Sequence, residues 1–375
     1  MTLRSPNSGR ALQADTATSL ADGTGERWPV VDGIAYLRTG SEDLAAAAVK
    51  ALDHGDRTTA LCLLLAQNDG WWDGPAPSDA NLRILIAQRD VLNLRQAMDL
   101  LGYGRVATYF AHRWSDPTYL AGLALLDAHW TAPRTAFELG CGIGHHLREL
   151  GRLGVAVTAG DVVFSKLWLA RHWVAGPVPQ LVCFDADAPW PIDIEVDLAF
   201  CHDALYFFAD KTGVVARLRR CAAHGLLAIA HIHNRAWPNL SSAAAMTLDE
   251  VQALFPDAVL YDDHALTLAA ASGSVPVQGG ALNVVEAFGL VCGPSLQPAH
   301  AANGPLLRPA DGCRLRRNPL CIDGKPAWPS DRYANEYASR ATYRCAAMVP
   351  DRAVMGSQWA DAAARRELLD LPERW

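Results

Sequence analysis

The stretch Phe137–His146, which reads FELGCGIGHH, decides the fold class. An apolar run carries an acid at Glu138, and glycines follow at every second position, at Gly140, Gly142 and Gly144. Glycine adopts left-handed conformations and lets the backbone come close to a ligand. A turn of this kind between a strand and a helix also presents backbone amides to an anionic or polar group. The stretch therefore predicts a strand, a ligand-binding turn and a helix.

The chain around this turn alternates short apolar runs with amphipathic segments. Strands are expected at residues 135–139, 155–161, 180–187, 196–203 and 226–233. Helices are expected at residues 144–154, 165–174 and 213–225. Strands and helices that alternate at these lengths are typical of a parallel sheet covered on both faces. The sequence therefore predicts an α/β fold with a doubly wound, mostly parallel sheet.

Segments on both sides of this core follow other patterns. Helices are expected at residues 41–55, 56–70, 78–102, 247–255 and 357–371, and an added strand at 281–291. Capping residues and closing glycines support the first two of these helices. We expect a mobile polar tail at 1–27, an N-terminal helical module at 28–115, an α/β domain at 116–293 and a C-terminal extension at 294–375 that wraps the core.

The composition argues against several classes of protein. The net charge of −7 disfavours a general nucleic-acid binder, which usually carries a basic patch. The longest nearly uncharged stretch, 265–287, contains glycines and a proline, so no membrane span is expected. The N-terminus lacks the apolar core of a secretory signal. Nine cysteines form no Cys-x-x-Cys pair, and several lie in apolar runs, as buried thiols do in a reducing compartment. A cytoplasmic protein is expected.

Four motifs in order resemble those of the class I S-adenosylmethionine-dependent methyltransferases. FELGCGIG resembles their first motif, and Asp161 ends the second strand about 20 residues later, as an acid that holds a ribose does. Asp185 and Ala186 end the third strand, and the segment 196–208, VDLAFCHDALYFF, resembles the fourth-strand motif. The resemblance covers residues 105–235.

This resemblance implies S-adenosylmethionine as the cofactor. Asp161 would accept hydrogen bonds from both ribose hydroxyls, which suits a carboxylate. Asp185 would accept a hydrogen bond from the adenine amino group, and the backbone N–H of Ala186 would donate one to a ring nitrogen. The full set implied at the cofactor is Glu138, Gly140, Cys141, Gly142, Gly144, Asp161, Val162, Asp185, Ala186 and His202.

Histidines follow two of the expected strands and offer a base. His202 and Asp203 close one strand, and His231 and His233 close the next. Methyl transfer to a hydroxyl or amine needs a group that takes up a proton, and histidine suits this near pH 7. His233 is the preferred base, with His202 and His231 as alternatives. A metal site at His231, His233 and Asp203 lacks a spacing signature, so no metal is expected.

Alternative functions remain open beside methyl transfer. A nicotinamide-dependent oxidoreductase would have the pattern G-x-G-x-x-G, with a glycine where His145 stands. A non-catalytic protein that retains the fold would not need Glu138, Asp161 and Asp185 together. The motif Asn-Pro-Pro-Phe/Tyr of enzymes that methylate nucleobase amines is missing after residue 203. We therefore expect methyl transfer to an oxygen or nitrogen of a small molecule, whose anionic groups Arg113, Arg332 or Arg340 could hold.

Overall fold

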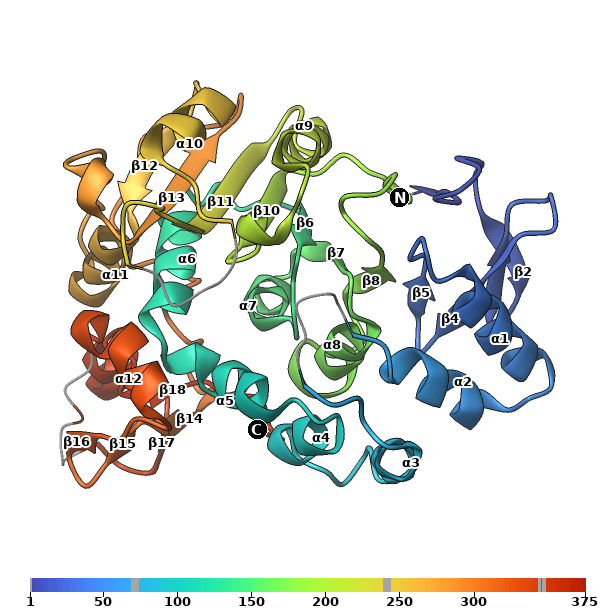
Figure 1. Cartoon of the computed structure of the whole chain (residues 1–375). Helices are drawn as coiled ribbons and strands as arrows, with labels where there is room; N and C mark the ends of the chain where they lie inside the picture. The colour runs from blue at the N-terminus through green and yellow to red at the C-terminus, as the bar shows by residue number, and fades with distance from the viewer. Residues whose placement is uncertain (1, 69–73, 239–243, 343–344, 346–348) are drawn as a thin grey trace. The chain divides into compact units, whose positions relative to one another are not determined.

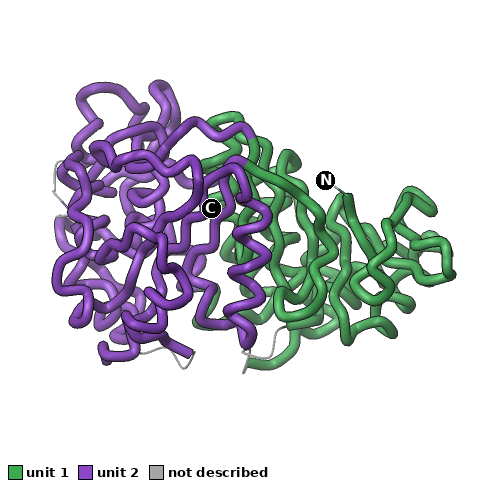
Figure 2. The backbone as a smooth tube through the Cα atoms, turned by 90° about the horizontal axis from the view of Figure 1, so that it is seen from above, with its two compact units in different colours: residues 1–107, 135–196, 373–375 green, residues 108–134, 197–372 purple. Residues whose placement is uncertain are grey.

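A computed structural model describes residues 2–68, 74–238, 244–342, 345 and 349–375. The chain forms two compact units (Figure 2). Unit 1 comprises residues 1–107, 135–196 and 373–375, and unit 2 comprises residues 108–134 and 197–372. These units do not follow the boundaries expected after residues 115 and 293, because each unit is assembled from separate segments of the chain.

The parallel strands of unit 1 include the strand that leads into the glycine turn. Strands β6 (Thr135–Leu139), β7 (Ala156–Asp161), β8 (Gln180–Cys183) and β5 (Ile34–Tyr36) pair in this order and run parallel. Leu139 pairs with Gly160, and Asp161 pairs with Cys183, so these strands end at one edge. The expected α/β fold with parallel strands is confirmed.

Residues 2–31 are not the mobile tail that the sequence predicted. They contain strands β1 (Thr2–Leu3), β2 (Gln13–Thr16), β3 (Ser19–Ala21) and β4 (Arg27–Val31). Strands β2, β3 and β4 extend the sheet beyond β5 as antiparallel neighbours, and β1 pairs with β9 (Ile192–Asp193). These strands are too short for a periodic apolar pattern, and β1 finds its partner far along the chain, so local sequence does not reveal them.

The helices of unit 1 begin at capping residues. Helices α1 (Glu42–Asp53) and α2 (Arg57–Leu65) match the expected positions. The helix expected at 78–102 is two helices, α3 (Asp79–Ala87) and α4 (Leu94–Leu100). Asn93 starts α4 with a reciprocal capping box to Gln96, which explains the break. Helix α7 (His145–Arg152) follows the glycine turn, and α8 (Phe164–Leu169) follows β7.

Unit 2 has a mixed sheet in the order β10, β11, β13, β12. Strands β10 (Leu198–His202) and β11 (Leu226–His233) run parallel, and β13 (Ala287–Cys292) and β12 (Val259–Asp262) are antiparallel neighbours. The strand expected at 281–291 thus joins the sheet, although it begins only at Ala287.

Several helices surround the strands of unit 2 (Figure 1). Helix α6 (Pro117–Ala128) is buried throughout and lies against β11, β13 and α11 (Asp263–Ser272). Helices α9 (Lys211–Cys221) and α10 (Leu248–Leu254) follow further along the chain. Helix α5 (Gly104–His112) leads into a short 3-10 turn at Arg113–Ser115 before α6 begins.

The last part of unit 2 has small cores of its own. Strands β14 (Arg314–Arg317), β17 (Arg352–Val354) and β18 (Leu368–Leu369) form one sheet, and β15 (Cys321–Ile322) and β16 (Lys325–Pro326) form a hairpin. The helix expected at 357–371 is only the short α13 (Ala360–Ala364). Arg366 ends it, because its backbone is left-handed at φ +61°.

The cysteines are of two kinds. Cys62, Cys183 and Cys201 are buried free thiols, as expected. Cys321 and Cys345, however, form a disulfide that the sequence did not predict. It packs with Leu320 and with two tyrosines of α12 (Asp331–Tyr337). Within the described part of the chain, no helix is long and apolar enough to cross a membrane.

Candidate active site

The turn between β6 and α7 is built from left-handed glycines. The φ angles of Gly140, Gly142 and Gly144 are +70°, +54° and +85°. The backbone N–H groups of Gly140 and Cys141 donate to the carbonyl oxygen of Gly160, at 2.8 and 3.2 Å. A Cβ atom on Gly144 would lie 2.9 Å from the Cβ of Ala170, so the position requires glycine for both conformation and space. The predicted strand, turn and helix are thus present.

Asp161 holds this turn from the neighbouring strand. Its Oδ2 accepts a hydrogen bond from the N–H of Gly142 at 2.9 Å, and its Oδ1 accepts one from the N–H of Val163 at 3.0 Å. The residue is buried. A carboxylate oxygen accepts two hydrogen bonds, so each oxygen retains capacity for a ligand. Asp161 therefore stabilises the turn whether or not it also binds a ribose.

Asp185 and Ala186 follow β8 at the same edge. Asp185 is half-buried, and its Oδ1 accepts a hydrogen bond from the N–H of Asp187 at 2.9 Å. The carbonyl oxygen of Ala186 accepts one from the indole of Trp190 at 2.9 Å. The ring of Trp190 lies 5.7 Å from that of Phe184, so packing fixes the segment after the strand.

The resemblance also assigns Glu138, Cys141 and Val162 of unit 1 to the cofactor site. Each of them is buried or contacts a residue of the same unit. A carboxylate oxygen of Glu138 lies 3.4 Å from Nδ1 of His146, which occupies the first turn of α7. Burial raises the pKa of the Cys141 thiol, so it stays protonated. The carbonyl oxygen of Val162 accepts a hydrogen bond from Arg38 at 3.2 Å.

These residues fit the cofactor that the motifs imply. Three glycines remove the side chains at alternate positions of the turn, and carboxylates stand at the ends of the next two strands at one edge of the sheet. A ligand with a ribose and an adenine needs acceptors of this kind. Asp161 and Asp185 would hold those two groups, and the backbone of the turn would lie against the remainder.

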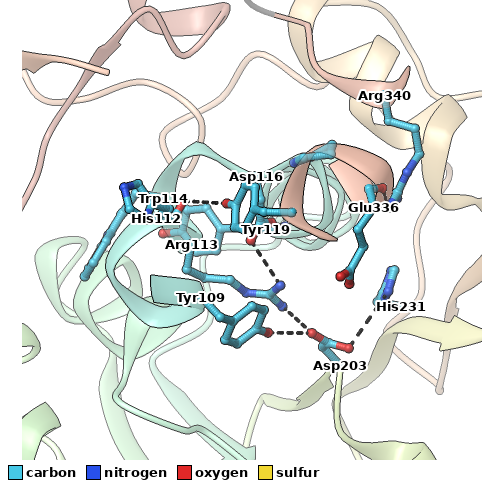
Figure 3. A network of polar contacts seen from close by, with 12 residues as sticks. Tyr109, His112, Arg113, Trp114, Asp116, Tyr119, Asp203, His231, Glu336 and Arg340 are labelled. Atoms are coloured by element: carbon cyan, nitrogen blue, oxygen red, sulfur yellow. Dashed lines mark hydrogen bonds and ion pairs between the residues drawn. The ribbon is translucent and has the colours of Figure 1, made fainter. Parts of the chain in front are cut away.

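A second group of polar residues lies in unit 2, where β10 and β11 end (Figure 3). Asp203 is its centre and has a left-handed backbone at φ +53°. Its Oδ2 accepts hydrogen bonds from the Tyr109 hydroxyl at 2.7 Å and from Arg113 at 2.9 Å, and its Oδ1 accepts one from the Tyr206 hydroxyl at 2.5 Å. Burial opposes ionisation, but Arg113 and the histidines hold the pKa of Asp203 well below its usual range.

His231 lies in a bulge of β11. The pairing of β11 with β13 shifts between Ile229 and Ile232, and His231 has a left-handed φ of +57°. Its Nδ1 lies 2.5 Å from a carboxylate oxygen of Asp263, and its Nε2 lies 3.9 Å from Oδ1 of Asp203. Burial disfavours the charged ring, but the two carboxylates outweigh burial and raise the pKa of His231.

His233 is buried beside His231 but has a different electrostatic environment. Its ring centroid lies 4.6 Å from that of His231 and 4.5 Å from that of Tyr206. Its Nδ1 has no hydrogen-bond partner among the described residues. Burial, and then the charge of His231, lower the pKa of His233 to about 4. His233 is therefore neutral at pH 7 and has a nitrogen that can accept a proton.

His202 ends β10 beside this group, with its ring centroid 6.4 Å from that of His231. Its ring stacks beside that of Phe200, with 5.9 Å between centroids, and the residue is buried. The structure thus brings His231 and His233 together with Asp203 and places His202 in a packing position. The contribution of His202 to a cofactor site stays a prediction.

The sequence analysis missed several members of this group. Asp116, Asp263 and Tyr109 were not singled out, and Glu286 was considered only as part of a strand. Asp116 caps α6 directly before Pro117, and Asp263 begins α11. Those helix-start signals are visible in the sequence, but the pairing of Tyr109 and Arg113 with Asp203, 94 and 90 residues away, is not.

Two of the three arginines expected to hold an anion, Arg113 and Arg340, already pair with carboxylates. Arg113 binds Asp203 at 2.9 Å and Asp116 at 3.3 Å. Arg340 binds Glu286 at 2.9 Å. Both arginines are buried. The expectation that they bind an anionic substrate is therefore not supported, because their charge is already compensated.

Asp203, His231 and His233 also have the composition of a metal site. One ligand atom from each lies within 4.8 Å of the others. Ligand atoms around a zinc ion are only about 3.4 Å apart, since the bonds are about 2.1 Å long. The carboxylate of Asp203 is also already engaged by Arg113 at 2.9 Å and by two tyrosine hydroxyls. The arrangement favours a network of hydrogen bonds over a metal site, and the absence of a metal stays a prediction.

Comparison with known proteins identified a domain in this chain. Residues 137–229 match the family model described as a methyltransferase domain. That range includes the glycine turn, Asp161, Asp185, Asp203 and the first half of β11, and it ends before His231. A search of curated proteins gave no match to the chain.

Solved structures give weaker similarities. A TehB-like SAM-dependent methyltransferase from Corynebacterium glutamicum is 16% identical with a TM-score of 0.38, over 50% of this chain and 94% of that chain. Phosphoethanolamine N-methyltransferase 2 from Haemonchus contortus is 19% identical with a TM-score of 0.36, over 46% of each chain. CalS10, an amino pentose methyltransferase from Micromonospora echinaspora, is 14% identical with a TM-score of 0.35. The similarity covers 50% of this chain and 95% of that chain.

Similarities at these identities and TM-scores say nothing about the substrate of this chain. The family match, in contrast, covers the segment in which the four motifs lie. Residues 137–229 thus match a methyltransferase domain, in agreement with the resemblance that the four motifs indicate.

Proposed function

We propose that this protein transfers the methyl group of S-adenosylmethionine to an oxygen or nitrogen of a small molecule, and that His233 takes up the proton that the acceptor loses. The observation that carries the proposal is the buried Nδ1 of His233, which has no partner among the described residues. A buried nitrogen without a partner is unfavourable unless a ligand supplies one. The acceptor group of the substrate would be that ligand.

The cofactor supplies an activated methyl group, so the protein must chiefly bind and align. In our proposal Asp161 accepts hydrogen bonds from the ribose hydroxyls. Asp185 accepts one from the adenine amino group, and the N–H of Ala186 donates to the ring. The backbone of the glycine turn lies against the methionine part, and Glu138 orients the turn. The observed bond between Asp161 and Gly142 supports a shared role in shaping this site.

The electrostatics favour His233 over His231 as the base. His233 is neutral at pH 7 because its pKa is about 4, whereas two carboxylates hold a proton on His231. Only the neutral imidazole can take up a proton, so the base must be uncharged before each transfer. We assign His231 and Asp263 a positioning role, since their hydrogen bond fixes the ring beside His233. His202 would pack against the cofactor.

The proposed substrate class and cellular location rest on the net charge and on the state of the cysteines. The net charge of −7 supports a small molecule over a nucleic acid. We propose a cytoplasmic location on the basis of the buried free thiols, although the disulfide of Cys321 and Cys345 is more typical of an oxidising compartment.

The test is methyl transfer from labelled S-adenosylmethionine to a protein-free extract of small molecules. We expect the wild type to transfer label, and His233→Gln to lower the turnover number by about 10²- to 10⁴-fold, the usual contribution of a general base. Affinity for S-adenosylmethionine should not change. His224→Gln is the matched control, because His224 is exposed. Unchanged turnover in His233→Gln would exclude this residue as the base.

The alternative functions predict other results. A nicotinamide-dependent oxidoreductase would bind NADH, and a non-catalytic protein would bind cofactor without any transfer. Neither is favoured by a particular observation in the structure.

A further inference from the structure

We propose that the acceptor atom is the nitrogen of an amine, and that the substrate reaches unit 2 as an ammonium ion. This inference rests on the proposed function and narrows its substrate class from oxygen or nitrogen to nitrogen. It is drawn from the charges and the hydrogen-bond partners in the group around Asp203 (Figure 3).

The group has more negative than positive side chains. Arg113 and Arg340 are its guanidinium groups. The carboxylates paired with them or with His231 are those of Asp116, Asp203, Asp263 and Glu286. Four carboxylates thus face two guanidinium groups, and even a proton on His231 leaves one negative charge in excess. Glu336, which acts electrostatically on Glu286, adds another.

This excess charge is buried. The side chains of Asp116 and Asp263 are 0% and 1% exposed, and that of Asp203 is 10% exposed. A net charge away from water is unfavourable unless a proton or a cation compensates it. Burial raises the pKa of Asp116 to about 6 and also raises that of Glu286, which is 23% exposed, so the ionised forms are disfavoured in this environment. A bound cation would supply the missing charge.

Two buried acceptor atoms of the group also lack donors. Nδ1 of His233 and Oδ1 of Asp263 have no hydrogen-bond partner within the described ranges. His233 is 5% exposed and Asp263 is 1% exposed. An ammonium ion has three N–H donors and a charge, whereas a hydroxyl has one donor and no charge. Of the two acceptor groups considered, only the ammonium ion meets both requirements.

Aromatic rings beside His233 suit a cation as well. The ring of Tyr206 lies 4.5 Å from His233 and 4.5 Å from Phe207. Burial raises the pKa of Tyr206 well above its usual value, so the phenol stays neutral. A neutral aromatic face attracts an ammonium ion through its quadrupole. The charges of Arg113 and Arg340 are already opposed by carboxylates, although Nε and Nη1 of Arg340 have no hydrogen-bond partner among the described residues.

The chemistry balances with these residues. The ammonium ion gives a proton to Nδ1 of His233 and becomes an amine with a free electron pair. The nitrogen then forms a bond to the methyl carbon while the carbon–sulfur bond breaks and its electrons stay on sulfur. The products are a methylated ammonium ion and neutral S-adenosylhomocysteine. His233 returns its proton to water.

The position of the label tests this inference. Full-length protein is incubated with trideuteromethyl S-adenosylmethionine and a protein-free small-molecule extract, and products are analysed by tandem mass spectrometry. We expect the label on nitrogen. Label only on oxygen would overturn the inference and leave the proposed function intact. Binding of S-adenosylmethionine without any labelled product would overturn the proposed function, and the inference with it.

A charge variant tests the same point on the labelled acceptor. Glu286→Gln removes one carboxylate, and we expect the KM of the amine to rise about 10-fold, the effect of about 1.4 kcal/mol, with a smaller change in kcat. Glu286→Asp should restore most of the affinity. Glu250→Gln is the matched control, because Glu250 also pairs with an arginine but both side chains are half exposed. An unchanged KM in Glu286→Gln would contradict the role of the excess charge.

Discussion

The glycine turn of unit 1 and the polar group of unit 2 are built in different ways. The turn depends on consecutive residues, since Gly140, Gly142 and Gly144 lie in one loop and Asp161 ends the next strand. The polar group joins side chains that are far apart in the chain, such as Arg113 and Asp203. The first can be recognised from sequence, whereas the second becomes visible only in the folded molecule. This difference shows that the cofactor is easier to identify than the acceptor.

The largest expected effect concerns the buried ion pairs of unit 2. Arg113→Met should lower the free energy of unfolding by about 3–5 kcal/mol, because Asp203 and Asp116 would remain buried without their cation. Chemical denaturation measures this. Arg219→Met is the control, since Arg219 and Asp257 are 32% and 54% exposed and their pair contributes at most about 1 kcal/mol. Equal losses in both variants would contradict the importance that we give to burial.

The next effect concerns the glycine turn of unit 1. Gly144→Ala should lower the free energy of unfolding by about 2–4 kcal/mol, since the backbone is left-handed and the new Cβ would meet Ala170 at 2.9 Å. Thermal and chemical denaturation measure this loss of stability. Gly151→Ala is the matched control within α7, where no atom lies within 4 Å of the added Cβ. There we expect a gain of about 0.5–1 kcal/mol. A stable Gly144→Ala protein would show that the turn tolerates a side chain.

A smaller effect is expected on cofactor affinity. Asp161→Ala should weaken binding of S-adenosylmethionine by about 1–3 kcal/mol, or roughly 10- to 100-fold, through lost hydrogen bonds to a charged group. Isothermal titration calorimetry measures this. Asp187→Ala serves as the control, because Asp187 is exposed at the end of the adjacent segment. If Asp161→Ala binds the cofactor as the wild type does, the ribose assignment is wrong.

The smallest effect is a difference in pKa between the neighbouring residues His231 and His233. Nitrogen-15 NMR of labelled histidines should show His233 titrating near pH 4 and His231 above its usual value of 6.5. A depressed pKa in the folded state means that His233 contributes stability above about pH 6.5, which is lost as the pH falls toward 4. The stability difference between the wild type and His233→Gln should therefore shrink over that range. Identical titration of the two rings would contradict their different roles.

The sequence predicted the elements whose signals are local. Strands β6, β7, β8, β10 and β11 and helices α1, α2, α7 and α9 lie where apolar periodicity and caps place them, whereas β9 was not predicted. The break between α3 and α4 depends on the capping box of Asn93, a signal present in the sequence but outweighed by the apolar period. Residues 2–31 gave no signal because strands of two to five residues are too short to show a period.

Other parts depend on contacts that sequence does not contain. The helix expected at 357–371 stops because Arg366 is left-handed and its guanidinium donates to the carbonyl oxygen of Trp114, 252 residues away. His231 and His233 were recognised as chemically useful residue types. Their unequal environments, however, come from a bulge in β11 and from Asp263 on another element. The residue types suggested that a histidine takes up a proton. The tertiary packing around each ring then set the pKa values that favour His233 for this role.

Calorimetric titration of the wild-type protein tests the central claim most directly. S-adenosylmethionine, S-adenosylhomocysteine and NADH are added in separate experiments. We predict that the first two bind and that NADH does not, because the turn at Gly140, Gly142 and Gly144 and the acids Asp161 and Asp185 fit the sulfonium cofactor. Binding of NADH, with no heat from S-adenosylmethionine, would contradict the account and return the chain to the oxidoreductase alternative.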